Sequence, residues 1–124
     1  MKRFLLALVM AGLLISGGLA VAGGSITPER LWSEFRANES AFKQNYGQDR
    51  IRMHGEVTSI GGGRDGPKVS FSAGGKSTLT CQFDDLPYTQ WELDMVSLGE
   101  TLRFSGVYDR NMQATMFFED CRLR

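Results

Sequence analysis

RIRMHGEVTSI, residues 50–60, is the stretch of sequence that decides the fold. Apolar and polar side chains alternate along it with the two-residue period of a strand that buries one face. The inward set is Ile51, Met53, Gly55 and Val57, and the outward set is Arg50, Arg52, His54, Glu56 and Thr58. Glycine in the middle of a strand weakens pairing and usually marks a bend or bulge. We therefore predict the long first strand of a small closed barrel, bent at Gly55.

The residues that follow predict four more strands and a short helix. The strands are expected at residues 68–72, 77–83, 101–108 and 113–122, with turns at 61–67, 73–75 and 109–111. Residues 84–98 are expected to form a loop and a short helix, because Trp91, Met95 and Leu98 are apolar at helical spacing. The prediction is a mainly β, five-stranded antiparallel OB-fold barrel, with a helix between its third and fourth strands.

A leading helix is predicted before the barrel. Thr27 supplies an N-cap hydroxyl, Pro28 the first helical position and Glu29 an acid in the first turn. Its stripe at helical spacing, which ends before a stop at Gly47, consists of Leu31, Phe35, Asn38, Phe42 and Tyr46, widened by Trp32. We expect this stripe to pack on the barrel; the alternative is a partner groove filled by Trp32 and Phe35.

Residues 1–22 have the pattern of a secretory signal peptide. Lys2 and Arg3 precede an apolar run at residues 4–15, and small residues at 20–22 fit a cleavage site. The unbroken apolar run is 12 residues long, against about 20 for a membrane span. We expect cleavage after Ala22 and a periplasmic or secreted protein, with an uncleaved anchor as the alternative. Residues 23–26 would then be a loose linker to a domain at 27–124.

The two cysteines, Cys81 and Cys121, both lie after the predicted signal peptide. An even pair in a small exported domain indicates a disulfide, and the third and fifth strands of an OB-fold are neighbours. A metal site is the alternative, but the chain has a single histidine and no CxxC motif. We expect a disulfide and no metal or cofactor.

Short segments along residues 27–124 resemble the tRNA-anti-like OB-fold family, small and often exported bacterial proteins of mostly unassigned function. The resemblance rests on the order and spacing of Leu31, Phe35, Asn38-Glu39, Tyr46-Gly47, Arg52-Met53-His54-Gly55-Glu56-Val57, Cys81-Gln82-Phe83, Leu98-Gly99-Glu100, Phe104-Ser105-Gly106-Val107 and Glu119-Asp120-Cys121. It implies the barrel and the Cys81–Cys121 pair, and it carries no catalytic residues. The glycine-rich turn at 61–67 departs from it.

No catalytic constellation is visible in the sequence. The segment 74–78, GGKST, ends like a phosphate-binding P-loop, but position 70 is not glycine and a strand follows, which favours a hairpin turn. His54 has no recognisable triad partner. The acid pairs at 84–85 and 119–120 are expected to be solvated. We therefore predict that the protein is not an enzyme.

The candidate ligand site is an anion patch of Arg50, Arg52 and His54, joined by Lys68. The alternative is a solvated strand face on which Glu56 is the local partner. Without the signal peptide the chain has 12 basic and 14 acidic residues, which gives no general attraction to polyanions.

The outward positions of the second and third strands offer no aromatic ring for base stacking. They are Lys68, Ser70, Ser72, Thr78, Thr80 and Gln82. The sequence therefore favours a non-catalytic exported module that binds a protein or envelope component, and it argues against nucleic acid as a partner. Nucleic-acid or nucleotide binding through the barrel face is the alternative.

Overall fold

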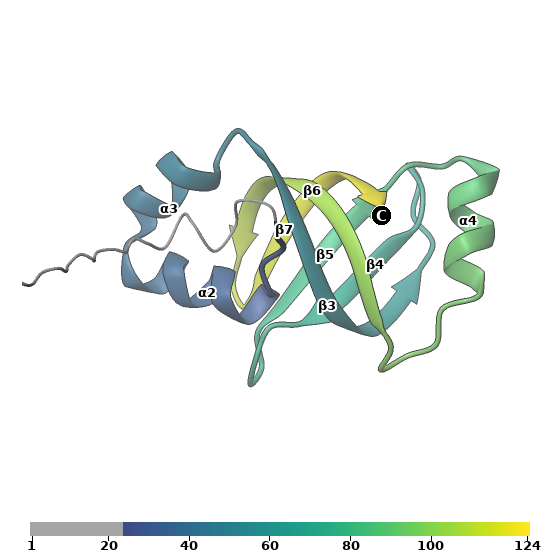
Figure 1. The fold of residues 1–124 in the computed structure, drawn as a ribbon, viewed down its shortest axis with the longest axis horizontal. Coiled ribbons are helices and arrows are strands. Elements are labelled where there is room, and N and C mark those ends of the chain that lie inside the picture. The colour runs from purple at the N-terminus through teal and green to yellow at the C-terminus, as the bar shows by residue number, and fades with distance from the viewer. Residues whose placement is uncertain (1–23) are drawn as a thin grey trace, which may run out of the picture.

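The computed structural model describes residues 24–124, so the predicted signal peptide lies outside the described residues. Five strands close into a barrel in the order β3-β4-β5-β7-β6, which confirms the OB-fold prediction (Figure 1). The strands are β3 (Arg50–Gly61), β4 (Lys68–Ser72), β5 (Thr78–Phe83), β6 (Thr101–Met112) and β7 (Thr115–Leu123). Helices α2 (Pro28–Ala37) and α3 (Glu39–Tyr46) lie at one end of the barrel, and α4 (Pro87–Asp94) lies at the other.

The barrel closes because its long strands each pair with two neighbours. β3 pairs with β6 over its first half and with β4 over its second half. Four of the five strand pairs are antiparallel, and β5 runs parallel to β7, with Cys81 opposite Phe118. This parallel pair differs from the all-antiparallel sheet expected from the sequence.

Gly55 serves a different purpose from the one predicted. The irregularity in β3 lies between Val57 and Ser59, and pairing with β6 is continuous through Gly55. A Cβ atom added at Gly55 would lie 3.0 Å from Cγ of Pro28 and 3.2 Å from Cδ2 of Phe71. The glycine therefore lets the first turn of α2 approach the barrel core, and the prediction of a bend at this residue was wrong.

The leading helix is two helices because Asn38 interrupts it. Asn38 is extended (φ −163°, ψ 98°), and its side chain accepts a hydrogen bond from the backbone N–H of Ala41 at 3.0 Å. It thereby caps α3, a role that asparagine favours over the helix interior. The predicted N-cap at Thr27 and the end at Gly47 are confirmed.

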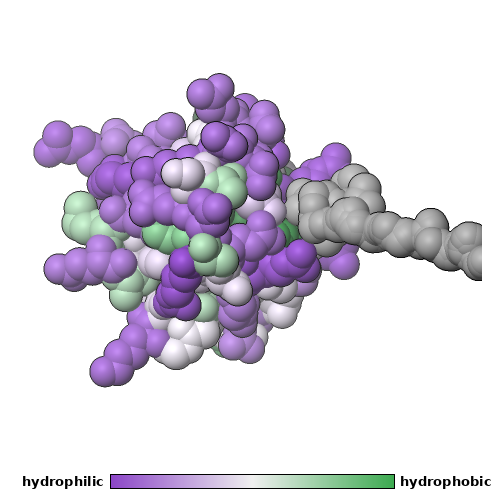
Figure 2. Space-filling view, turned by 90° about the vertical axis from the view of Figure 1, so that its left-hand side faces the viewer, coloured by the Kyte–Doolittle hydropathy of each residue, from purple (hydrophilic) through white to green (hydrophobic). Residues whose placement is uncertain are grey.

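The apolar stripe of α2 and α3 packs on the barrel, as predicted. Leu31, Trp32, Phe42 and Tyr46 are buried, and the indole N–H of Trp32 donates to the carbonyl oxygen of Thr78 at 2.9 Å. The outer surface at this end of the molecule is mainly hydrophilic (Figure 2). The alternative, a partner groove filled by Trp32 and Phe35, is therefore wrong, because Trp32 is buried and Phe35 packs against the core beside it.

The expected linker is ordered where the structure describes it. The N–H of Ile26 donates to the carbonyl oxygen of Arg52 at 3.0 Å, and the N–H of His54 donates to that of Ile26 at 3.2 Å. Ile26 is buried in the core. These two hydrogen bonds hold the start of the described chain against β3. Burial of the apolar Ile26 side chain stabilises this arrangement over a solvated linker.

Two bulges shape β6 and β7. The polar residues 109–111, expected to form a turn, lie inside β6, where Asp109 is unpaired, and the chain turns instead at Gln113 and Ala114. On β7, Asp120 has a positive φ of 51°. Residues 119–121 of β7 lie opposite only two residues of β6, Gly106 and Val107, so β7 has one extra residue here. Because of this extra residue, Phe118 and Cys121 both point inward.

The Cys81–Cys121 disulfide is confirmed, with the two Cα atoms 5.9 Å apart. Both cysteines are buried in the core. The bond joins β5 to β7 inside the barrel, at the parallel pair. In the part of the chain from residue 24 onward, no helix is long and apolar enough to cross a membrane.

Candidate functional site

The structure separates the members of the predicted anion patch. Lys68 pairs with Gly61 and Gln82, at the opposite end of β3 from Arg50. Arg50 itself is engaged: its guanidinium donates to Oγ of Ser105 at 3.1 Å and to the carbonyl oxygen of Asp120 at 2.8 Å, and it pairs with the Asp120 carboxylate. Arg50 therefore holds the β7 bulge and is not available to a ligand.

His54 is tied to the segment before α2. Its Nδ1 lies 2.6 Å from Oγ of Ser25, and the ring is half-buried. No group of three His, Cys, Asp or Glu side chains within residues 24–124 is placed to hold a metal ion. The geometry gives His54 a role in fixing Ser25 against β3.

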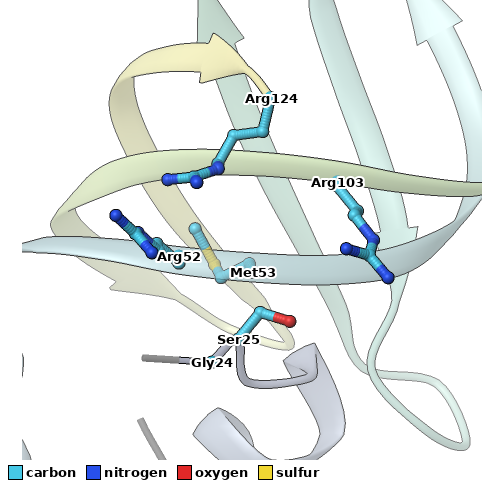
Figure 3. Close-up of a pocket in the computed structure, with 6 residues that line it drawn as sticks. All are labelled: Gly24, Ser25, Arg52, Met53, Arg103 and Arg124. Carbon is cyan, nitrogen blue, oxygen red and sulfur yellow. The ribbon is translucent and has the colours of Figure 1, made fainter. Parts of the chain in front are cut away.

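Arg52, another member of the patch, lines a pocket. The pocket has a volume of about 150 Å³ and is lined by Gly24, Ser25, Arg52, Met53, Arg103 and Arg124. In Figure 3, the side chains of Arg52 and Arg124 extend to one side of the pocket and Arg103 extends to the other. We call Arg52, Arg103 and Arg124 the arginine row.

Strand pairing explains how this row assembles from three distant parts of the sequence. β3 and β6 pair so that Arg103 lies opposite His54, which is two residues along from Arg52 and on the same face of the strand. The end of β7 lies on the other side of β6, where the N–H of Arg124 donates to the carbonyl oxygen of Arg103 at 3.2 Å. The row therefore crosses three adjacent strands.

The charge of the row is not neutralised by the described chain. Arg52, Arg103 and Arg124 form no ion pair within residues 24–124, whereas Arg30, Arg50, Arg110 and Arg122 each do. Residues 1–23 contain no Asp or Glu, so that segment has no carboxylate side chain to offer. Three exposed guanidinium groups with no Asp or Glu side chain among the pocket residues attract anions, and their planar donor forks suit phosphate oxygens.

Sequence reasoning missed two members of the row for different reasons. Arg103 lies between the buried or half-buried Leu102 and Phe104, so strand alternation could have placed it on the outer face beside Arg52. Arg124 lies beyond the bulge at Asp120, which changes the alternation in a way that no residue pattern indicates.

A second surface feature lies on the same barrel, near the start of β7. The outward positions of β4 and β5 carry hydroxyl groups, with Ser70 bonded to Thr80 and Thr78 to Thr115, each at 3.0 Å. Thr80 pairs with Phe117 of β7, whose ring is half-buried.

The guanidinium carbon of Arg110 lies 5.0 Å from the centre of the Phe117 ring. Aromatic rings and guanidinium planes are both surfaces on which unpaired bases stack. The sequence analysis considered only the second and third strands, and the parallel pairing adds this ring from the fifth.

Comparison with known proteins places the fold but gives no family. No protein-family model matches the chain, and no curated protein does. Among solved structures, a lipoprotein of Klebsiella pneumoniae named for a proposed nucleic-acid-binding role matches with a TM-score of 0.59 and 16% identity. The match covers 89% of this chain and 99% of that one.

Two further matches have lower scores. The mitochondrial single-stranded DNA binding protein Rim1 of S. cerevisiae matches with a TM-score of 0.45 and 12% identity, over 61% of this chain and 92% of that one. RecG bound to a three-way DNA junction matches with the same score and identity, over 62% of this chain and 11% of that one.

These findings correct one prediction. The sequence argued against nucleic acid as a partner, but the described chain shares its fold with a protein named for nucleic-acid binding, so that exclusion was wrong. The physical reason lies in two features that the sequence argument did not contain. First, the net charge describes the whole domain, whereas the arginine row concentrates positive charge around one pocket. Second, β7 supplies an aromatic ring, that of Phe117.

Proposed function

We propose that this protein is an OB-fold module that binds single-stranded nucleic acid, with backbone phosphates on the arginine row. The observation that carries the proposal is a set of three exposed arginines around one pocket, none of which forms an ion pair within residues 24–124. Because Arg103 extends to the opposite side of the pocket from Arg52 and Arg124, the charges are spread across the pocket. Cations spread in this way suit the successive phosphates of a polymer better than they suit one isolated anion.

Phe117 favours a single strand over a duplex, because stacking on a protein side chain needs an unpaired base. Seven positions separate Phe117 from Arg124 along the outer surface of β7, or roughly 20 Å at strand spacing. Between them the Asp120 carboxylate is paired with Arg50 and Arg122, while the exposed Glu119 is not. A nucleic-acid strand lying along the outer surface of β7 would contact both Phe117 and Arg124, and it would pass Glu119.

The remaining parts of the proposal concern compartment and class. The leader pattern at residues 1–22 supports an exported protein, periplasmic or secreted. The lack of a recognisable catalytic constellation supports a binding role without enzymatic activity. Membership of the tRNA-anti-like family stays a prediction that rests on the short segments described above.

The experiment is a salt titration of binding to a fluorescein-labelled oligothymidylate of about 20 nucleotides, followed by anisotropy; OB-folds occupy about 4–16 nucleotides. Three phosphate contacts predict a slope of log K against log salt of about −2, from −0.7 per contact. The variants Arg52→Ala, Arg103→Ala and Arg124→Ala should each reduce the slope by about 0.7. Arg30→Ala is the matched control, because Arg30 is an exposed arginine on α2, at an end of the barrel.

Glu119→Gln tests the path between the two features. Removing this carboxylate should strengthen binding and should leave the contribution of Phe117 unchanged. A triple arginine variant that binds with the parent affinity and slope would refute the proposal. A duplex that binds more tightly than the single strand would refute the preference for unpaired bases, and full competition by a mononucleotide would assign the pocket to nucleotides.

A further inference from the structure

The α4 end of the barrel exposes an unusual amount of apolar surface. Five large side chains in and beside this helix are between 57% and 75% exposed. We call them the α4 surface: Leu86, Tyr88, Trp91, Met95 and Leu98. Scattered exposed apolar residues are normal, but a contiguous patch marks an interaction site.

Helical spacing makes the central part of the α4 surface contiguous. Tyr88, Trp91 and Met95 are separated by three and four positions, which places them on one side of the helix. The helix meets the rest of the protein through Thr89 and Leu93, which are buried and lie on the opposite side. Burial of α4 on the barrel therefore does not account for its apolar stripe.

The charged side chains of the segment that carries the α4 surface all have one sign. Residues 84–100 contain five acids and no Lys, Arg or His. The acids are Asp84, Asp85, Glu92, Asp94 and Glu100, and none forms an ion pair within the described chain. Asp84 and Glu100 accept local hydrogen bonds, from Thr89 and from the N–H of Ser97, which leaves their negative charge in place.

We propose that the α4 surface docks a basic, amphipathic polypeptide segment, independently of nucleic-acid binding. The apolar side of the segment would cover the stripe around Trp91, and its Lys or Arg side chains would face the acids. An amphipathic helix laid on an apolar surface is a common mode of peptide recognition. Complementary charge sets the orientation of the segment and the choice of partner.

The same charges disfavour the other occupants. Nucleic acid and anionic membranes would be repelled by five unpaired carboxylates. Helices that lie in a membrane interface carry Lys and Arg on their polar side, and residues 84–100 have none. A second copy of the chain would bring like charges together, which is costly in an interface.

Calorimetry of the protein with two synthetic peptides tests the proposal. One is a 15-residue amphipathic helix of Leu and Lys, and the other has Glu at every Lys position. We expect the Lys peptide to bind and the Glu peptide not to bind. Trp91 gives a second readout, because Trp32 is buried: its emission should shift to the blue, and quenching by acrylamide should fall, only with the Lys peptide.

Two variants and a matched control locate the site. Met95→Ser combined with Leu98→Ser should weaken peptide binding by about tenfold or more, since each removes an exposed apolar group. Glu92→Gln combined with Asp94→Asn should weaken it and reduce its dependence on salt. Met112→Ser is the control, because Met112 is 54% exposed but lies on β6, outside residues 84–100.

Four results would overturn the proposal. The Glu peptide could bind as well as the Lys peptide, or the Met95/Leu98 variant could bind as the parent does. Trp91 could already be shielded from acrylamide in the free protein, or could become shielded as the protein concentration rises. Either result would assign the surface to the protein's own chain. Binding to phosphatidylcholine vesicles without binding to the Lys peptide would assign it to lipid.

Discussion

Replacing both Cys81 and Cys121 with alanine should destabilise the protein by several kcal/mol. The disulfide joins residues 40 positions apart. In the chain-entropy model a closed loop of this length lowers the entropy of the unfolded chain by about 13 cal/mol/K, or roughly 4 kcal/mol at 25 °C. For a domain of this size, that loss corresponds to a decrease in Tm of about 16–32 °C.

Urea unfolding separates this mechanism from a loss of packing. Both sulfur atoms lie in the core, so alanine also leaves a small cavity. Loss of the cross-link lets the unfolded chain expand and expose more surface, which raises the m-value, whereas a cavity alone leaves the m-value unchanged. We therefore expect a lower midpoint together with a steeper dependence on urea.

The single variants Cys81→Ala and Cys121→Ala serve as controls, because each breaks the cross-link but retains one buried thiol. They should show the same rise in m-value as the double variant. An unchanged m-value with a Tm decrease of only a few degrees would show that the loop-entropy reasoning does not apply to this barrel.

Three further predictions concern other parts of the protein. Gly106→Ala places a Cβ atom 2.7 Å from Sγ of Cys121, and we expect a loss of about 1–3 kcal/mol in urea unfolding. Gly61→Ala, whose Cβ would meet nothing within 4 Å, should change the stability by less than about 0.5 kcal/mol. Burial and the hydrogen bond from Tyr46 to Glu34 raise the pKa of Tyr46 to about 12, so the folded state favours the neutral phenol. This stabilisation is present below pH 10 and is lost as the pH rises through 12; Tyr46→Phe should therefore show a flatter decline in chemical-denaturation stability over that range, and an equally steep decline would contradict the assignment. Phe117→Ala should weaken single-strand binding by about 1–3 kcal/mol in the anisotropy titration without changing its salt slope, and a changed slope would mean that the ring acts through Arg110.

The barrel could be predicted from the sequence because its signals are local. Alternation at Ile51, Met53 and Val57, the cap at Thr27 and the cysteine pair each depend on a few neighbouring residues. The errors arose where one residue has two physically reasonable roles. Asn38 fits a helical stripe by spacing but caps a helix by chemistry, and Gly55 fits a bend but serves a close helix contact.

The candidate site was harder to predict because it depends on pairing between distant strands. Arg50 and Arg52 look equivalent in the sequence, and only the position of Asp120 shows that one is engaged and the other is exposed. Arg103 and Arg124 join Arg52 only after β6 and β7 have taken their places in the sheet.

The bulge at Asp120 has a consequence for how this protein tolerates changes in length. Asp120 is the extra residue of the bulge, so deleting it would restore simple alternation along β7 and leave every later side chain on its present face. Cys121 would still face the core, and Arg122 and Arg124 would still face solvent. The loss of this one amino acid would therefore spare the cross-link and the proposed phosphate contact, and its cost would be the Asp120 carboxylate that pairs with Arg50 and Arg122.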